Sequence, residues 1–414
     1  MIIEILATGD EIRTGAAIDS NSAHIAQVLE QVGLEATRHT CVGDDMEMMI
    51  SIIKEIGSRA DFAVVTGGLG PTSDDITAEA AAKAKGVELV LNREALGVVE
   101  NFFKTRKRIM SPSNKKQAML PKGAESLNNP IGSAPGFHLK INSCWFFFVP
   151  GVPFEMRRML WDEVLPRIEK LSGRTDELSL AKTISTFSLT ESETGELLHG
   201  LSVEFPEITL GFRSKFPEIQ VKLYIRGTDD KVLRKILEKA SQWVLGKLGD
   251  NVFSKNGRSM EAVVGELLAQ KQATLAVAES CTGGLISHML TNVPGSSGYF
   301  IFSGVTYSNQ AKSKVLGVSD QILQRYGAVH PETVKKMAQG VRRVGGTTYG
   351  LATSGIAGPD GGTDEKPVGT LCIGLATPNN VKGFRFFFPF NTRLMNKKIF
   401  AMKALDLLRR ELQG

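Results

Sequence analysis

A serine and a lysine in the C-terminal third of the chain are residue types that can act together as a nucleophile and its base. Ser297 lies in the segment GSSGYF, and Lys312 ends the segment VTYSNQAK, which also contains Tyr307. A lysine amine deprotonates a serine hydroxyl only when it is itself uncharged, which requires burial to lower its pKa from about 10.4. Ser-Lys pairs are an established alternative to the Ser-His-Asp triad. The pattern predicts Ser297 as nucleophile, Lys312 as its base and Tyr307 beside them.

Three other side chains compete with Ser297 for the role of nucleophile, namely Ser280, Cys281 and Ser296. A cysteine thiolate is intrinsically the better nucleophile, but a lone cysteine beside glycines is more often a small buried packing residue. Ser297 is preferred because Tyr307 and Lys312 follow it within one strand and one turn. The alternatives stay open at the level of sequence.

Two glycine-rich loops occur in the same third of the chain, AESCTGG at 278–284 and SGIAGPDGG at 354–362. Each follows an apolar run that reads as a strand, so the backbone N–H groups can point at an anion without side chains in the way. Glycines that merely form tight turns are the alternative interpretation. Two such loops in one region favour a phosphate ligand.

A third glycine-rich loop, TGGLGPTSDD at 66–75, follows an apolar run near the N-terminus. Glycine backbone and a helix N-terminus can bind a phosphate there, and Asp74 and Asp75 can bind a hard divalent cation, although paired acids are also common helix caps. The segments TGDEI (8–12), NPIGSAPG (129–136) and PGVPFEM (150–156) fall at further strand ends and add Asp10 and Glu11 to the same rim. The binding positions predicted in this region are Gly67, Gly68, Gly70, Thr72, Gly132 and Glu11.

The elements that must position these residues form three regions. Residues 1–170 alternate strands (2–8, 62–66) with helices (21–32), which predicts a parallel α/β sheet with ligands at the carboxyl ends of its strands. A polar linker is expected at 171–177, and residues 176–250 predict a small α+β domain. A second domain boundary is expected at 251–257. Residues 255–414 are predicted to form another α/β domain, with a helix capped by Ser259 and strands at 274–278, 349–353, 369–376 and 381–388.

Composition excludes several classes of protein. The chain has 414 residues, 42% of them hydrophobic and 22% charged, and a formal charge of +5, which is ordinary for a soluble globular protein. The densest basic run, 104–108, lacks interleaved aromatics, so nucleic acid is not an expected partner. The four cysteines are far apart without a C-x-x-C pair, which argues against zinc and a disulfide framework. No apolar run reaches membrane-spanning length and no leader pattern is evident, so we expect a cytoplasmic protein that does not contact membranes.

The C-terminal motifs resemble a known family. AESCTGG, GSSGYF, VTYSNQAK, GAV, SGIAGPDGG and KPVGT, in this order, are similar to the CinA C-terminal (PncC-type) domain, whose members hydrolyse the carboxamide of nicotinamide mononucleotide. The resemblance implies an acyl-forming Ser297, Lys312 as base, Tyr307 as an orienting hydroxyl, and no cofactor. It also implies that the nucleotide is surrounded by Thr282, Gly283, Gly284, Ser354, Gly355, Ile356, Ala357 and Gly358.

The N-terminal motifs resemble the molybdopterin-binding fold of the MoaB and MogA proteins, and more closely the N-terminal domain of CinA proteins. The whole chain thus resembles a full-length CinA, in which the middle region is a KH-type domain. The resemblance implies hydrolysis of ADP-ribose to AMP and ribose 5-phosphate with a divalent metal ion (magnesium, manganese or cobalt), which Asp74 and Asp75 would bind. It also implies a homodimer.

The hypothesis from sequence is therefore a bifunctional hydrolase that recycles pyridine nucleotides, with nicotinamide mononucleotide and ADP-ribose as its small-molecule partners. Two rival hypotheses remain. One is a binding protein or transferase of molybdenum-cofactor metabolism, and the other is a non-catalytic protein associated with competence for DNA uptake.

Overall fold

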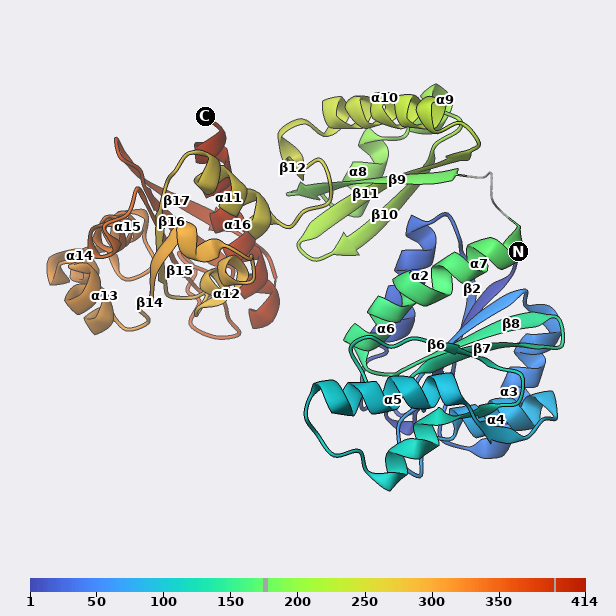
Figure 1. The fold of residues 1–414 in the computed structure, drawn as a ribbon. Helices are drawn as coiled ribbons and strands as arrows, with labels where there is room; N and C mark the ends of the chain where they lie inside the picture. Colours follow the sequence, from blue (N-terminus) through green and yellow to red (C-terminus); the bar gives the residue numbers. More distant parts are fainter. Residues whose placement is uncertain (174–177, 391) are drawn as a thin grey trace. The chain divides into compact units, whose positions relative to one another are not determined.

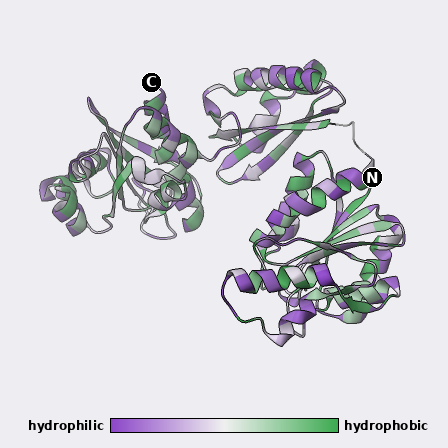
Figure 2. Ribbon diagram, in the orientation of Figure 1, coloured by the Kyte–Doolittle hydropathy of each residue, from purple (hydrophilic) through white to green (hydrophobic). Residues whose placement is uncertain are grey.

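The computed structural model describes residues 1–173, 178–390 and 392–414 and is a mixed α/β structure (Figure 1). Most of the expected linker, residues 174–177, lies outside the described residues. The chain forms two compact units, Met1–Leu180 with Arg226–Leu233, and Ala181–Ile225 with Arg234–Gly414. In the described residues, the three larger sheets have six, four and five strands and follow one another along the chain. Figure 2 shows apolar and polar residues interleaved along most of the helices and strands.

The N-terminal sheet has the strand order β2-β1-β3-β8-β7-β6. Its parallel part consists of β1 (Ile3–Thr8), β2 (Ala36–Val42), β3 (Phe62–Thr66) and β8 (Cys144–Val149). The other two strands, β7 (Gly136–Ile141) and β6 (Glu125–Leu127), are antiparallel and extend the sheet beyond β8. The predicted parallel sheet is thus correct for four strands, while one edge is antiparallel.

Helices cover both faces of this sheet because its strands are apolar on both faces. Ile5, Val64 and Phe147 pack with one group of helices: α2 (Ser20–Gln31), α6 (Pro153–Met159), a π-helical turn (Leu160–Val164) and α7 (Leu165–Ser172). Leu6 and Val65 pack with the other group: α3 (Met46–Arg59), α4 (Thr77–Lys85) and α5 (Arg93–Thr105). The remaining elements are α1 (Asp10–Arg13), β4 (Leu89–Leu91), a 3-10 helix (Pro112–Ala118) and β5 (Met119–Pro121). Successive strand residues therefore face different helix layers.

The middle sheet has the order β10-β11-β9-β12. Its strands are β9 (Leu178–Phe187), β10 (Thr209–Lys215), β11 (Glu218–Gly227) and β12 (Val252–Ser254). Its helices are α8 (Glu191–Leu197), α9 (Leu201–Glu204) and α10 (Asp230–Leu248), followed by a 3-10 turn (Gly249–Asn251). Val221, Leu223 and Ile225 of β11 are buried and alternate with less buried residues, as its sequence pattern predicts. KH domains hold nucleic-acid backbone with a G-x-x-G loop. The middle region contains one G-x-x-G string, at 246–249, but it lies at the end of α10 and in the 3-10 turn, not in a loop between two helices.

The C-terminal sheet has the order β14-β13-β15-β16-β17. Its parallel part consists of β13 (Leu275–Glu279), β14 (Phe300–Val305) and β15 (Tyr349–Gly355). The last two strands, β16 (Thr370–Ala376) and β17 (Val381–Phe387), are antiparallel. One face packs against α11 (Met260–Gln270), α12 (Leu285–Thr291) and α16 (Arg393–Gln413). The other face packs against α13 (Asn309–Leu316), α14 (Asp320–Tyr326) and α15 (Pro331–Gly345).

The predicted elements of this region agree with the structure within a few residues. Ser259 occupies the N-cap position of α11, and the four expected strands correspond to β13, β15, β16 and β17. Across the described part of the chain, every helix is too short or too polar to cross a lipid bilayer.

Candidate active sites

The C-terminal site is centred on Lys312, whose side chain is buried near the carboxyl ends of two parallel strands. Ser280 directly follows β13, and Lys312 lies in α13, which follows β14. Parallel strands place their carboxyl ends at the same edge of a sheet, so residues that follow β13 and β14 meet there. Nζ of Lys312 lies 3.1 Å from Oγ of Ser280, and only 1% of the lysine is exposed.

Two backbone carbonyls fix the direction of the Lys312 amine. Nζ donates to the carbonyl oxygens of Thr306 and Tyr307, each at 2.9 Å. An uncharged amine has two N–H donors and one lone pair. As an ammonium, Nζ donates to Ser280 Oγ as well as to the two carbonyls; in the uncharged form the two N–H groups stay on the carbonyls and the lone pair faces Ser280 Oγ. In this geometry, the uncharged Lys312 amine can accept the hydroxyl proton of Ser280.

The electrostatic surroundings of Lys312 also favour its uncharged form. Burial lowers the pKa of Lys312, because a charged ammonium loses its hydration there. Within the described residues, no carboxylate forms a salt bridge with this amine. A low pKa with a serine hydroxyl in reach is the arrangement required of a lysine base.

Ser297 is not the partner of Lys312, and this sequence-based expectation is wrong. Ser297 lies in a short 3-10 helix (Ser296–Gly298) before β14, whereas Lys312 lies after β14. At about 3.3 Å per residue, the six residues of β14 span about 20 Å. Ser297 is also exposed. Ser296 lies in the same helix, so Ser280 is the serine that the fold brings to the lysine.

The hydroxyl of Tyr307 forms its hydrogen bond with a residue of α16. It accepts a hydrogen bond from Nη2 of Arg393 at 3.1 Å, while Nη1 of the same arginine donates to the carbonyl of Gly358 at 2.8 Å. Arg393 thus connects the tyrosine to the 354–362 loop. Tyr307 contributes to the lysine site through its backbone carbonyl. No motif in the sequence indicated Arg393.

The two glycine loops of this region meet at the same sheet edge. The N–H of Ser280 donates to the carbonyl of Thr353 at 3.1 Å, and the Thr282 and Thr353 hydroxyls are 2.8 Å apart. The predicted contact residues of the first loop (Thr282, Gly283, Gly284) and of the second (Ser354, Gly355, Ile356, Ala357, Gly358) therefore flank one site.

Not every predicted donor of the second loop is available. The N–H of Ile356 donates to Thr370 within the sheet, so it cannot also reach a ligand. A Cβ on Gly283 would lie 3.4 Å from Nζ of Lys397, so a second cation of α16 stands beside the first loop. Neither Lys397 nor Arg393 followed from the glycine motifs.

Two buried acidic groups next to Ser280 have structural roles. Burial raises the pKa of the Cys281 thiol to about 12, and its side chain packs in the core, which excludes a reactive thiolate at neutral pH. Glu279 is 0% exposed, and its carboxylate accepts from the backbone N–H groups of Gly284, Ile286 and Ser287 and from the Ser287 hydroxyl. Glu279 thereby holds the 280–284 loop in its conformation.

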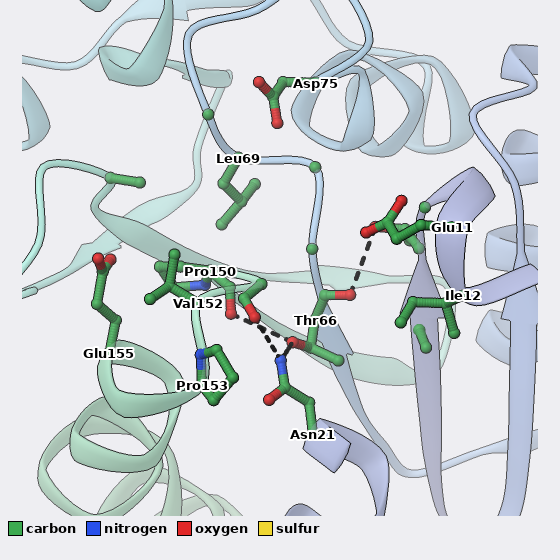
Figure 3. Close-up of a pocket in the computed structure, with 18 of the residues that line it drawn as sticks. Glu11, Ile12, Asn21, Thr66, Leu69, Asp75, Pro150, Val152, Pro153 and Glu155 are labelled. Atoms are coloured by element: carbon green, nitrogen blue, oxygen red, sulfur yellow. Dashed lines mark hydrogen bonds between the residues drawn. The ribbon is translucent and has the colours of Figure 1, made fainter. Parts of the chain in front are cut away.

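The N-terminal site is a pocket of about 530 Å³ at the carboxyl ends of β1, β3 and β8 (Figure 3). Its lining includes six of the predicted residues: Glu11, Gly67, Gly68, Gly70, Asp74 and Asp75. The backbone of Gly67 and Gly68 has φ of 114° and 65°, values that favour glycine. A Cβ on Gly67 would also lie 2.5 Å from the Thr8 carbonyl. The loop therefore requires glycine to pass close to β1.

Two residues predicted to bind the ligand, Thr72 and Gly132, do not line the pocket. Thr72 donates to Oδ2 of Asp75 through its N–H at 2.8 Å and through its hydroxyl at 2.5 Å. Gly132 lies next to Glu155, and Glu155 itself lines the pocket. Asp10 likewise does not line the pocket and forms a salt bridge with Arg13. The sequence motifs did not single out Asp44, Asn21 or Glu155.

Three acidic side chains of the pocket lie near the glycine loop. Among the described residues, no group of three or more His, Cys, Asp or Glu side chains is placed to hold a metal ion. Asp44, Asp74 and Asp75 nevertheless line the same pocket as the glycine loop. Burial raises the pKa of Asp44, and the charges of Asp10, Glu11 and Asp74 raise it further. Magnesium is commonly held by one or two carboxylates plus phosphate oxygens, so these residues fit such an ion together with a phosphate ligand.

Comparison with known proteins extends over the whole chain. Residues 257–412 match the model of the CinA C-terminal domain, and residues 4–170 match that of a probable molybdopterin binding domain. A CinA-like protein of Desulfosudis oleivorans is 53% identical over 412 residues and covers 100% of both chains. A CinA-like protein of Shewanella sediminis is 42% identical and covers 100% of this chain and 96% of its own.

Solved structures match single domains. The competence/damage inducible protein of Agrobacterium tumefaciens is 32% identical, with a TM-score of 0.36, and covers 38% of this chain and 98% of its own. The two family models together span most of the chain, and the full-length relatives are CinA-like proteins. The chain described here belongs to the CinA-like protein family, with a MoaB/MogA-like N-terminal domain and a CinA C-terminal domain.

Proposed function

We propose that the C-terminal site hydrolyses the carboxamide of nicotinamide mononucleotide to nicotinate mononucleotide and ammonia. The observation that carries the proposal is the buried Lys312 amine, held by two carbonyls and 3.1 Å from the Ser280 hydroxyl. Ser280 takes the role that the sequence motifs had suggested for Ser297. The reaction class, acyl transfer to a serine, is the one for which a neutral lysine base is suited.

The chemistry proceeds through an ester on Ser280. Lys312 accepts the hydroxyl proton while Oγ attacks the carboxamide carbon, and the resulting tetrahedral oxyanion needs hydrogen-bond donors near the 280–284 loop. The C–N bond breaks, and the leaving nitrogen receives the proton from Lys312, which releases ammonia. A water molecule then gives a proton to Lys312 and attacks the ester carbon. The carboxylic acid leaves, and the proton returns to Oγ of Ser280.

The charges around the loops support a nucleotide as the substrate. Arg393 and Lys397 both lie in the first turns of α16, one beside Gly358 and the other beside Gly283. A phosphate group between the two loops would meet both cations and glycine backbone. The mononucleotide carries one such phosphate in addition to its carboxamide.

Removing the hydroxyl of Ser280 tests this mechanism. We expect Ser280→Ala and Lys312→Ala each to lower ammonia release from nicotinamide mononucleotide by about 1000-fold or more, as the loss of a nucleophile or its base does in serine hydrolases. Ser297→Ala is the matched control and should stay within about twofold of the wild type. Ammonia release is measured in a coupled assay, and circular dichroism checks the fold. Full activity of Ser280→Ala would overturn the assignment.

We further propose that the N-terminal pocket cleaves the pyrophosphate of ADP-ribose to AMP and ribose 5-phosphate. The glycine loop at 67–70 and the carboxylates of Asp44, Asp74 and Asp75 line one pocket, which suits a phosphate together with a divalent cation. Such an ion would neutralise phosphate charge and lower the pKa of an attacking water. The protein groups would orient the pyrophosphate on the loop backbone.

A chelator and a single substitution test the second activity. We expect EDTA to abolish AMP formation from ADP-ribose, and magnesium, manganese or cobalt to restore it. Asp74→Asn should lower the rate by about 10-fold or more, because the amide removes a negative charge that favours the cation. Asp162→Asn, on an exposed salt bridge with Arg158 in the helical segment after α6, is the control. Turnover that persists in EDTA would reject a metal-dependent reaction.

The rival functions have distinct signatures. Co-purification of molybdopterin would support a molybdenum-cofactor role of the N-terminal domain. DNA retardation with a steep salt dependence would support a competence-associated binding protein. We retain three further expectations as proposals: a KH-type middle domain, a homodimer, and a cytoplasmic protein without nucleic-acid or membrane partners.

A further inference from the structure

The N-terminal pocket contains a carboxylate that the proposed phosphate and metal chemistry does not use. Glu155 lies in the first turn of α6 and lines the pocket. Figure 3 shows its side chain on the opposite side of the pocket from Glu11, with Leu69 and Thr66 between them in the view. The glycine loop and the acids proposed to bind a cation therefore leave this wall for another part of the ligand.

The carboxylate is held in place by one of its oxygens. Oε2 accepts a hydrogen bond from Nδ2 of Asn129 at 2.8 Å, and the same Nδ2 donates to the carbonyl of Ala134 at 2.8 Å. Oδ1 of Asn129 accepts from the N–H of Gly132 at 2.9 Å. A Cβ on Gly132 would lie 1.9 Å from Oε2, so glycine is required for the carboxylate to occupy this position.

The other oxygen has no protein donor. Among the described residues, Oε1 of Glu155 accepts no hydrogen bond, and no cation forms a salt bridge with the carboxylate. Burial raises the pKa of Glu155, whereas the Asn129 hydrogen bond and the charge of Arg106 lower it. The pocket therefore presents one carboxylate oxygen that can accept hydrogen bonds from a ligand.

We propose that Glu155 forms a subsite for the hydroxyl groups of a ribose ring in the N-terminal pocket. The inference rests on the proposed use of ADP-ribose, and it identifies the Glu155 carboxylate as the group that would recognise a ribose of this ligand. A phosphate would be repelled by this carboxylate, whereas ribose hydroxyls donate to it, as they do to acidic residues in dinucleotide-binding sites. Phosphates would then lie at the glycine loop and the sugar against Glu155.

Paired changes in the protein and the ligand test the subsite. Glu155→Gln keeps the size of the side chain and an acceptor for Asn129, so the pocket should keep its shape. We expect wild-type kcat/KM to fall about 10-fold when ADP-ribose is replaced by an analogue that lacks the 2′-hydroxyl of one ribose. One analogue lacks that hydroxyl on the adenosine ribose and a second lacks it on the terminal ribose. Glu155→Gln should lower activity on ADP-ribose and remove the discrimination against one of the two analogues.

Controls separate this effect from a general loss of structure. Glu94→Gln, on the exposed surface of α5, should discriminate as the wild type does. A hypoxanthine analogue of ADP-ribose tests whether the carboxylate reads the adenine amino group instead. The proposal is overturned if Glu155→Gln discriminates against both deoxy analogues as the wild type does, or if it changes selectivity only against the hypoxanthine analogue.

A binding measurement keeps the subsite testable if the proposed reaction fails. Calorimetry of AMP, 2′-deoxy-AMP and ribose 5-phosphate with the full chain needs no turnover. If the wild type cleaves no ADP-ribose, the proposed function fails by itself. The subsite is then supported if Glu155→Gln binds AMP more weakly than the wild type does while both proteins bind 2′-deoxy-AMP equally. Weaker binding of ribose 5-phosphate by Glu155→Gln than by the wild type would support it as well. Equal affinities in both proteins for all three ligands would overturn it.

Discussion

Lys312 shows how a single buried amine acquires chemistry from its surroundings. Two backbone carbonyls take its hydrogen bonds, and burial lowers its pKa without an acidic partner to compensate. The same burial that makes the amine a base also destabilises the folded protein whenever the amine is protonated. The proposed role of Lys312 as a base and a pH-dependent stability penalty therefore have the same physical cause, the burial of its amine.

This penalty predicts a pH-dependent difference between the wild type and Lys312→Met. The folded pKa of Lys312 lies below its ordinary value of 10.5, so between the two values the unfolded chain binds more protons. Stability must then rise with pH across that window. We expect the free energy of unfolding of the wild type to rise relative to that of Lys312→Met as the pH increases toward 10.5. Urea denaturation at several pH values measures the difference, and parallel profiles would contradict a lowered pKa.

At the scale of elements, both candidate sites are built from strands that end in tight glycine turns. Gly67 follows β3, and Gly283 and Gly284 come shortly after β13, all with positive φ. Such turns let the chain reverse direction at the sheet edge, and the N–H groups of Gly67, Gly283 and Gly284 all donate within the protein. Where the loop touches a neighbouring strand, as Gly67 approaches the Thr8 carbonyl, no other residue fits without displacement.

The constraint at Gly67 predicts a contrast between two alanine substitutions. Gly67→Ala would place Cβ 2.5 Å from the Thr8 carbonyl at a φ of 114°, so we expect a loss of about 2 kcal/mol or more of stability. Gly97→Ala, inside α5 with open space around it, should stabilise by about 0.5–1 kcal/mol. Thermal denaturation compares the variants. A Gly67→Ala protein as stable as the wild type would show that the loop can rearrange.

At the scale of the whole molecule, each candidate site is contained within one compact unit. The residues that line the N-terminal pocket all belong to the first unit, and Ser280, Lys312, Arg393 and Lys397 belong to the second. Each unit thus contains the groups that are proposed for its own reaction.

This arrangement predicts that the two activities can be removed separately. We expect Ser280→Ala to leave AMP formation from ADP-ribose within about twofold of the wild type, because the N-terminal pocket keeps all its groups. EDTA should likewise leave ammonia release unchanged. Both products can be followed by mass spectrometry in one incubation with both nucleotides. A parallel loss of the two activities would show that the units depend on each other.

Local sequence indicated several of the strands, the helix start at Ser259, the glycine loops and the family to which the chain belongs. Apolar runs of five to seven residues marked β1, β3, β13 and β16, because a strand covered on both faces has no polar side. The six pocket-lining residues predicted near the N-terminus were found because each lies directly after a strand or in its loop. For these residues, closeness along the chain to the end of a strand was sufficient to predict that they line the pocket.

Tertiary structure alone decided which serine meets Lys312 and which cations join the loops. Ser297 precedes β14 and Lys312 follows it, so a spacing that looks short along the chain spans the full length of a strand. Ser280 is more distant in sequence but lies at the correct edge, because parallel strands bring their carboxyl ends together. Arg393 reaches Tyr307 only because α16 packs back on the sheet. Sequence distance carries no information about the side of a sheet on which a residue lies, and that side fixes the chemistry.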